Sequence, residues 1–192
     1  MAVPPHALGP TLDKTGLRSD LRRRRREFVA SLEPATRVAA IAEITTRVIG
    51  RLPRKAVVAL YLPIDAEVDT LPLIERLGRV ALPCIGAAKA PLVFRAWSVG
   101  EPLTPTRLGV SQPCETAPVV DPDVFITPLV GVDDALTRLG YGGGYYDRAF
   151  AAFPNAYRIG LAWSVQCVPY LPRDPWDMPL HAVATEQDWI TT

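Results

Sequence analysis

Apolar positions near the start of the chain recur at helical spacing. Leu17, Leu21 and Phe28 are spaced four and seven residues apart, which places them on one stripe of a helix predicted over residues 14–31. Asp13 stands directly before this segment, where an N-cap side chain accepts hydrogen bonds from the first turn.

A second helical pattern covers residues 34–49. It begins with a proline, which suits a first helical turn, and it is followed by Gly50, which suits a helix end. Its predicted apolar side contains Val38, Ile41, Ile44 and Ile49. Two helices therefore precede any strand.

The pattern then changes to short, continuous apolar runs, which are typical of strands covered on both faces. The four runs are AVVALYLP (56–63), VALPCI (80–85), VFITPLV (124–130) and IGLAW (159–163). Helical segments predicted at 70–78 and 145–153 alternate with them. This alternation predicts an α/β fold with a mostly parallel sheet and helices on both faces. Ligand sites are then expected beyond the carboxyl ends of the strands.

Other segments fit this scheme less directly. LVFRAW, residues 92–97, is interpreted as an added antiparallel strand, and the proline-containing residues 100–122 as a surface excursion. Trp97, Trp163 and Trp176 are candidates for the core.

The composition is typical of a globular protein. The 192 residues are 48% hydrophobic and 21% charged, and no apolar run reaches 18 residues. We predict a single domain over residues 13–192, preceded by a flexible leader at residues 1–12 without the features of a secretory signal. A soluble, cytoplasmic monomer with no membrane partner is expected.

The cysteines argue against a zinc site. Cys84, Cys114 and Cys167 are far apart, no CxxC pair occurs, and the chain has only two histidines. We expect them to be free and at least half-buried.

Charge is distributed unevenly along the chain. Residues 1–55 hold 12 basic and 5 acidic residues, against 9 basic and 15 acidic in the remainder, for a net charge of +1. This pattern fits a polyanion-binding arm or a basic helix lying against an acidic body. The near-neutral total favours the second interpretation, so no nucleic-acid partner is expected. The arginines at 22–26 sweep more than one helical turn, and we expect them to face solvent, some of them paired with acidic neighbours.

Polar and aromatic residues follow three of the predicted strands. The segments are PIDAEVDT (63–70), GVDDALTRLGYGGGYYD (131–147) and WSVQCVPYLPRDPWD (163–177). Because ligands bind beyond the carboxyl ends of such strands, we expect one cleft lined by all three.

The stretch RLGYGGGYYD, residues 138–147, is the most unusual of these. Backbone N–H groups of a glycine-rich turn can converge on an anion, and a following helix adds the positive end of its dipole. The turn matches neither a P-loop, because no lysine follows, nor a regular GxGxxG motif. From these residues alone, a phosphate cradle and a tight loop without a ligand both remain open.

With Arg148 added, this stretch resembles the signature of the 5-formyltetrahydrofolate cyclo-ligase family, also called methenyltetrahydrofolate synthetases. Other segments resemble the family's motifs in the same order. They are KTGLR (14–18), EVDT (67–70), Gln112–Pro113 and DPWDMPLHAVATE (174–186). The resemblance covers roughly residues 14–190.

The resemblance implies a single three-layer, Rossmann-like α/β domain and an enzyme that uses ATP and Mg²⁺. The implied reaction converts 5-formyltetrahydrofolate to 5,10-methenyltetrahydrofolate with release of ADP and phosphate. The formyl oxygen attacks the γ-phosphate to give an iminium phosphate, and N10 of the folate then displaces phosphate. Phosphorylation turns a poor leaving group into a good one, so the protein mainly positions substrates and stabilises charge.

The resemblance also implies roles for individual residues. Catalytic roles fall on Lys14, Arg138 and Tyr146, and metal binding on Asp147 and Asp177. The implied ATP-binding residues are Lys14, Thr15, Gly16, Leu17, Arg18, Arg138, Leu139, Gly140, Tyr141, Gly142, Gly143, Gly144, Tyr145 and Tyr146. The implied folate-binding residues are Leu62, Glu67, Tyr141, Gly142, Gly143, Gly144 and Tyr145.

Three positions depart from the family pattern. Leu136 replaces a glycine, Trp176 a residue that is commonly His, and His181 a common aspartate. If position 136 requires positive φ, leucine there is strained. The other two changes bear on substrate orientation and rate. A non-catalytic folate-binding or nucleotide-binding homologue therefore stays open as the alternative.

Overall fold

The structure is a computed structural model that describes residues 13–86, 90–106 and 109–192. The predicted leader at residues 1–12 lies outside this range. Among the described residues, no helix is long and apolar enough to cross a membrane.

The helices agree with the sequence prediction. They are α1 (Lys14–Ser31), α2 (Pro34–Ile49), α3 (Leu71–Leu77) and α4 (Tyr145–Ala152). Asp13 caps α1 as expected, because its carboxylate accepts hydrogen bonds from the backbone N–H groups of Thr15 and Gly16 at 3.0 and 3.2 Å. Val38, predicted on the apolar side of α2, is instead exposed, whereas Ile41 and Ile44 are buried.

The main sheet has seven strands in the order β12-β11-β9-β6-β1-β2-β3. Their bounds are β1 (Val58–Ala59), β2 (Arg79–Cys84), β3 (Val93–Ser98), β6 (Val124–Pro128), β9 (Tyr157–Leu161), β11 (Ala182–Ala184) and β12 (Trp189–Ile190). The five central strands are parallel, and the edge strands β3 and β12 are antiparallel to their neighbours. The predicted antiparallel strand at residues 92–97 is therefore confirmed.

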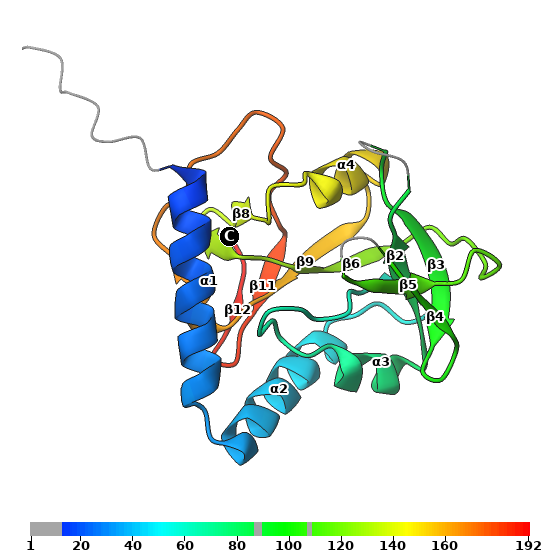
Figure 1. The fold of residues 1–192 in the computed structure, drawn as a ribbon, viewed down its shortest axis with the longest axis horizontal. Helices are drawn as coiled ribbons and strands as arrows, with labels where there is room; N and C mark the ends of the chain where they lie inside the picture. The colour runs from blue at the N-terminus through cyan, green and yellow to red at the C-terminus, as the bar shows by residue number, and fades with distance from the viewer. Residues whose placement is uncertain (1–12, 87–89, 107–108) are drawn as a thin grey trace, which may run out of the picture.

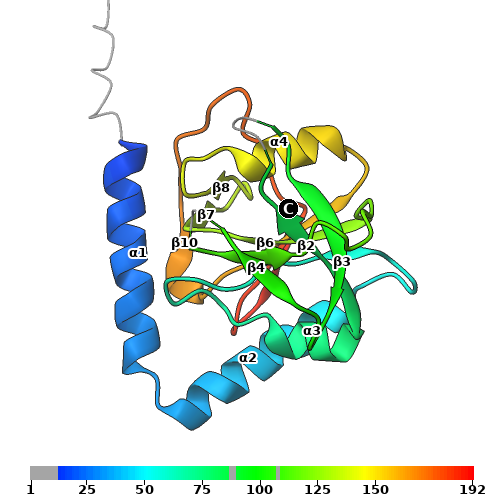
Figure 2. The same ribbon diagram turned by 45° about the vertical axis from the view of Figure 1, so that its right-hand side comes forward.

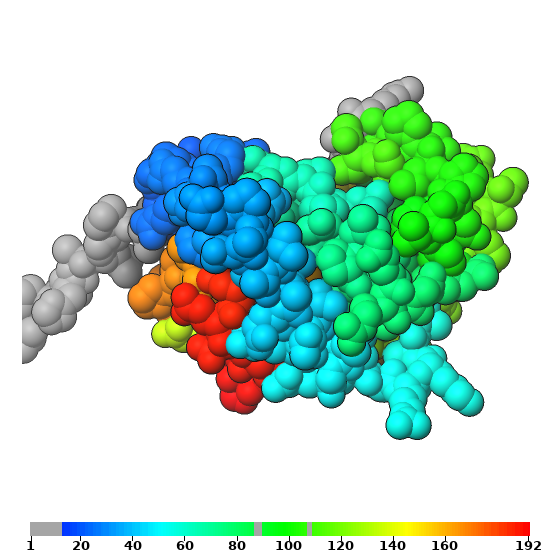
Figure 3. Space-filling model, turned by 90° about the horizontal axis from the view of Figure 1, so that it is seen from below, coloured from blue at the N-terminus to red at the C-terminus, as the bar shows by residue number. Residues whose placement is uncertain are grey.

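Helices cover both faces of this sheet (Figure 1). Alternate residues of each strand point to opposite faces, so Val58 and Ala59 belong to different clusters of buried residues. One cluster joins the sheet to α2 and α3, which lie on the side seen in Figure 3. The other joins it to α4 through Ala149 and Phe150. The predicted three-layer α/β architecture is confirmed.

Strand order reverses direction between β1 and β6. From β1 the chain crosses through α3 to β2 on one side, and from β6 it crosses through α4 to β9 on the other. In open α/β sheets such a switch point leaves a crevice at the carboxyl ends of the two strands. Helix α1 stands beside these ends in both ribbon views (Figure 2), with the Arg25 guanidinium 3.3 Å from the carbonyl oxygen of Leu129, just after β6.

Several short elements were not predicted from the sequence. A three-stranded sheet is formed by β7 (Gly131–Asp133), β8 (Arg138–Leu139) and β10 (Cys167–Val168). The excursion at residues 100–122 contains a small antiparallel pair, β4 (Leu103–Pro105) and β5 (Ser111–Pro113). A 3₁₀ helix, η1 (Ser164–Gln166), follows β9. Trp97 and Trp163 are core residues as proposed, but Trp176 is 67% exposed.

Candidate functional site

Two cavities adjoin each other at the switch point, where a single cleft was predicted. One has a volume of about 360 Å³ and is lined largely by charged residues and glycines. The other has a volume of about 440 Å³ and is lined largely by apolar and aromatic residues. Five residues line both cavities and form the wall between them: Pro128, Tyr141, Gly143, Tyr145 and Tyr146. All three predicted segments contribute to this pair of cavities.

Lys14 is the central cation of the polar cavity. Its ammonium group donates hydrogen bonds to carboxylate oxygens of Asp174 at 2.7 Å and Asp177 at 2.6 Å. Partial burial opposes ionisation of Lys14, but these two carboxylates outweigh it and raise its pKa. Burial likewise opposes ionisation of Asp177, but the Asp174 N–H and Lys14 hold the pKa of Asp177 below its usual value. Lys14 and Asp177 are therefore each held in the ionised form by the other.

Two arginines complete the cationic lining. Arg18, one helical turn after Lys14, donates from Nε to the carbonyl oxygen of Gly140 at 2.8 Å. Arg138 is buried, lies over the ring of Tyr146, and donates to Asp147 at 3.1 Å. The Nε of Arg138 has no hydrogen-bond partner within the described parts of the chain, so this guanidinium keeps an unused donor.

The glycine turn needs glycine for two separate reasons. Gly142 and Gly144 have φ of 94° and 63°, in the left-handed region that glycine enters without strain, and Gly144 is the N-cap residue of α4. Gly140 and Gly143 are instead limited by space. An added Cβ would lie 2.6 Å from Nη1 of Arg138 at the first position and 2.8 Å from the Tyr145 ring at the second. The turn therefore combines a special backbone with close side-chain packing.

Among the described residues that line the apolar cavity, Glu67 is the only carboxylate. It is 5% exposed, accepts a hydrogen bond from the Ile64 N–H at 2.9 Å, and accepts a short one from the Tyr141 hydroxyl. Burial raises the pKa of Glu67 even though these hydrogen bonds and Arg25 act in the opposite direction. The remaining lining is largely aliphatic and aromatic, which suits a flat, mostly apolar ring system with a few polar atoms.

The arginine run is less exposed than we predicted. Arg25 is fully buried, and Arg22, Arg25 and Arg26 all pair with Asp65, at 2.8, 3.1 and 3.1 Å. The expectation that the run faces solvent is therefore wrong for Arg25. Because α1 lies across the strand ends, one face of its arginine run points inward, where Asp65 pairs with it.

Most residues with predicted roles line these cavities. Those in the polar cavity are Lys14, Arg18, Arg138, Leu139, Gly140, Tyr141, Gly142, Gly143, Gly144, Tyr145, Tyr146, Asp147 and Asp177. Those in the apolar cavity are Leu62, Glu67, Tyr141, Gly143, Tyr145 and Tyr146. Gly142 and Gly144, predicted also for folate, line only the polar cavity, and Thr15, Gly16 and Leu17 line neither.

Some lining residues were missed or misjudged from the sequence. Asp174 lies in the segment DPWDMPLHAVATE, but no role was predicted for it. Tyr61 lies within the predicted strand at residues 56–63, where the sequence pattern indicates only a buried strand. Trp176 lines the polar cavity. His181 lines neither cavity and instead accepts a hydrogen bond from the backbone N–H of Arg158 at 3.0 Å. Its replacement of an aspartate thus lies away from both cavities.

Leu136 adopts the strained conformation that was considered for it. Its φ is 58°, and its side chain is 1% exposed within the cluster under α4. The neighbouring carboxylate of Asp133 fixes this turn by accepting hydrogen bonds from the N–H groups of Ala135, Thr137 and Leu171 at 2.8 to 3.0 Å. Burial of the leucine side chain offsets a conformation in which glycine would be relaxed.

The carboxylates of the polar cavity are chemically suited to Mg²⁺. Asp147 and Asp177 line the same cavity, and Mg²⁺ binds through one or two carboxylates together with phosphate oxygens and waters. Within residues 13–86, 90–106 and 109–192, no group of three His, Cys, Asp or Glu side chains could hold a metal by itself. A cation here would complete its coordination with waters or with oxygens of a bound phosphate.

Known proteins share this sequence and fold. The model of the 5-formyltetrahydrofolate cyclo-ligase family matches residues 10–186. The 5-formyltetrahydrofolate cyclo-ligase of Escherichia coli K12 is 39% identical over 139 residues, which cover 67% of this chain and 76% of the relative. The enzyme of that name from Haemophilus influenzae is 30% identical over 86% of this chain and 96% of its own length. The NMR structure of Aquifex aeolicus 5,10-methenyltetrahydrofolate synthetase has a TM-score of 0.75, with 29% identity and coverage of 91% and 92%.

Proposed function

We propose that this chain, which belongs to the 5-formyltetrahydrofolate cyclo-ligase family, converts 5-formyltetrahydrofolate to 5,10-methenyltetrahydrofolate with ATP as co-substrate. The reaction releases ADP and phosphate. The observation that carries the proposal is the pair of adjoining cavities, one charged and one apolar, that share a wall of tyrosines and glycine.

The polar cavity suits the triphosphate. Lys14, Arg18 and Arg138 supply cations, and the buried Nε of Arg138 has no partner among the described residues. The glycine turn and the N-terminus of α4 add backbone N–H groups and the positive end of a helix dipole. Asp147 and Asp177 would hold Mg²⁺ against phosphate oxygens, and the bound cation would neutralise charge on the triphosphate.

The apolar cavity suits the folate. Its aromatic and aliphatic walls fit the ring system, and the Glu67 carboxylate offers acceptors to N–H groups of the pterin. With the formyl group at the shared wall, its oxygen faces the end of the triphosphate. An O–P bond forms there as the bond from the γ-phosphorus to ADP breaks. N10 then attacks the formyl carbon, loses its proton, and phosphate leaves.

In this arrangement the chain's residues chiefly orient and neutralise. Lys14 and Arg138 balance negative charge that shifts toward the transferred phosphoryl group. Tyr146 belongs to the shared wall, and burial raises the pKa of its phenol, so it remains protonated and acts as a neutral group.

The test is an assay of the purified protein with 5-formyltetrahydrofolate, ATP and Mg²⁺. Absorbance of the methenyl product should rise in step with ADP, and omission of ATP or Mg²⁺ should stop both. Asp147→Asn should abolish turnover. Turnover without nucleotide would contradict the proposal. Thermal stabilisation by either ligand with no ADP formed would indicate the alternative, a non-catalytic folate-binding or nucleotide-binding homologue.

A further inference from the structure

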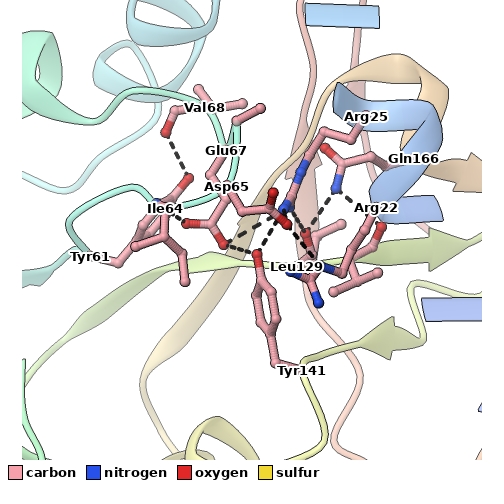
Figure 4. Close-up of polar contacts among 12 residues, drawn as sticks. Arg22, Arg25, Tyr61, Ile64, Asp65, Glu67, Val68, Leu129, Tyr141 and Gln166 are labelled. Carbon is pink, nitrogen blue, oxygen red and sulfur yellow. Dashed lines mark hydrogen bonds and ion pairs between the residues drawn. The ribbon is translucent and has the colours of Figure 1, made fainter. Parts of the chain in front are cut away.

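The buried guanidinium of Arg25 joins three segments that lie far apart in the sequence (Figure 4). Its Nη1 donates to the carbonyl oxygen of Leu129 at 3.3 Å, at the end of β6. Its Nη2 donates to Asp65 at 3.1 Å and to the Tyr141 hydroxyl at 3.0 Å. One side chain of α1 therefore contacts the end of the sheet, the loop after β1 and the glycine turn.

The loop after β1 is held in an uncommon conformation. Asp65 and Ala66 are consecutive non-glycine residues with φ of 48° and 61°. Such strain persists only where surrounding contacts fix it, and it is often found at functional sites. Here Arg22, Arg25 and Arg26 hold the Asp65 carboxylate, while the Trp163 indole donates to the carbonyl oxygen of Ala66 at 3.1 Å.

This loop places Glu67 directly after the two strained residues. The Arg25 guanidinium lies 4.0 Å from the Glu67 carboxylate. It also donates a hydrogen bond to the Tyr141 hydroxyl, which in turn donates a hydrogen bond to Glu67. Arg25 itself does not line the apolar cavity, whereas Glu67 and Tyr141 do. Its influence on a ligand there must pass through these two side chains.

We propose that Arg25 is a positioning residue for folate, acting through Tyr141 and Glu67. The inference rests on the proposed function, because it takes the apolar cavity as the folate site. The two terminal nitrogens of the guanidinium reach three acceptors, the Leu129 carbonyl, the Asp65 carboxylate and the Tyr141 hydroxyl, and a lysine ammonium lacks this forked geometry. Lys14, on the same helix, pairs instead with Asp174 and Asp177 in the polar cavity, so its task is separate.

The central experiment compares Arg25→Met, Arg25→Lys and Arg24→Met by steady-state kinetics with each substrate varied in turn. Arg24 is exposed and pairs with Asp20, so its variant is the matched control. Arg25→Met should raise the KM for 5-formyltetrahydrofolate roughly a hundredfold, the scale of an ångström-sized misplacement, with less than a threefold change for ATP. Arg25→Lys should recover part of the loss, and Arg24→Met should match the wild type. Equal effects on both substrates would overturn the proposal.

The pH dependence of kcat/KM for the folate gives a second readout that loss of packing alone would not move. The titratable and charged groups facing Glu67 are Arg25 from α1, Tyr61 and Asp65 from the segment after β1, Tyr141 from the glycine turn and Tyr146 from α4. Removing the Arg25 cation should shift the acidic limb upward by about one pH unit in Arg25→Met. An unchanged limb would count against the proposal.

Tyr141→Phe keeps the test decisive if Arg25→Met does not fold. Tyr141 is 38% exposed, so its hydroxyl can be removed without opening the core. This variant should weaken folate binding, measured by calorimetry without ATP, by about tenfold. In the double variant with Arg25→Lys the losses should be less than additive, and additive losses would show that Arg25 does not act through Tyr141. Failure of the wild type to turn over would refute the proposed function, whereas this binding test would still decide the role of Arg25.

Discussion

One carboxylate in each cavity, Asp177 in the polar cavity and Glu67 in the apolar cavity, has a shifted pKa, and the two shifts have opposite directions. In the polar cavity, the Asp174 N–H and Lys14 outweigh the effect of burial and lower the pKa of Asp177. In the apolar cavity, burial prevails over the hydrogen bonds around Glu67 and raises its pKa. A charge is thus stabilised on one side of a shared wall and destabilised on the other.

This difference teaches that the two cavities are built for different tasks. A site that must accept a polyphosphate gains from ionised groups held ready, because their charge is balanced before the ligand arrives. A site for an apolar ring gains from one acceptor in a low-dielectric surrounding, where a single hydrogen bond discriminates strongly. The following variants change the polar cavity, the apolar cavity, the shared wall and finally the pH dependence of stability.

The largest effect is expected from Lys14→Met. It removes the cation that pairs with Asp174 and Asp177 and leaves two carboxylates unbalanced where phosphates should bind. We expect kcat/KM for ATP to fall about 10²- to 10³-fold. Folate affinity measured without nucleotide should stay within about twofold. Arg37→Met, an exposed change of equal charge on α2, is the control and should have no effect.

Glu67→Gln should give the next largest effect, and on the opposite substrate. The change keeps the shape of the side chain but exchanges one acceptor of the apolar cavity for a donor. We expect kcat/KM for 5-formyltetrahydrofolate to fall about 10- to 100-fold, with the KM for ATP nearly unchanged. Glu75→Gln on the exposed side of α3 is the control. An equal loss for both substrates would remove the distinction between the cavities.

Gly143→Ala tests the wall itself. The new Cβ would meet the Tyr145 ring at 2.8 Å, and because φ at this position is not positive the backbone can accept alanine. Displacement of the ring should raise both KM values by about three- to tenfold. Gly50→Ala, which meets ordinary contact distances at the end of α2, should raise neither. A change in only one KM would mean that Tyr145 serves a single cavity.

The smallest effect is expected in the pH dependence of stability. Glu67 has a folded pKa above its ordinary 4.5, so its favourable contribution is complete below that pH and is lost as the pH rises through the folded value. Asp177 has a folded pKa below 3.8, so its contribution is present above 3.8 and is lost as the pH falls. The free energy of unfolding, measured with urea from pH 3 to 8, should therefore rise for Glu67→Gln relative to the wild type as the pH increases. For Asp177→Asn it should fall relative to the wild type over the same range. Parallel curves would contradict both assignments.

The sequence predicts those parts of the fold in which local patterns agree with tertiary structure. The bounds of α1 and α2 are right because capping residues, helical spacing and burial coincide. The strands β11 and β12 were missed because two or three residues carry too little pattern, and their pairing comes from partners far along the chain. The predicted strand at 56–63 shrinks to Val58–Ala59, because its later residues leave the sheet to form the cavity wall.

The site was predicted from motifs more than from physics. The glycine turn was recognised from its composition, and the order of the motifs indicated the other lining residues. Arg25 could not be singled out from its four neighbouring arginines, because its burial depends on where α1 meets the sheet. Asp65 gave no signal as its partner, since the two are forty residues apart in sequence.

Helix α1 also sets the distance and the relative rotation between the cations of the polar cavity and Arg25, which contacts two residues of the apolar cavity. The helix carries Lys14 and Arg18 near its start and Arg25 further along. Leu21, between them, packs so closely on Gly131 that a Cβ added to Gly131 would lie 2.6 Å from the Leu21 side chain. Lys14 and Arg25 are eleven residues apart, or roughly 16 Å of helix. Inserting one residue between Arg18 and Arg25 would turn one end by about 100° against the other. The number of residues between Arg18 and Arg25 is consequently a constraint on both cavities, although it belongs to no single side chain.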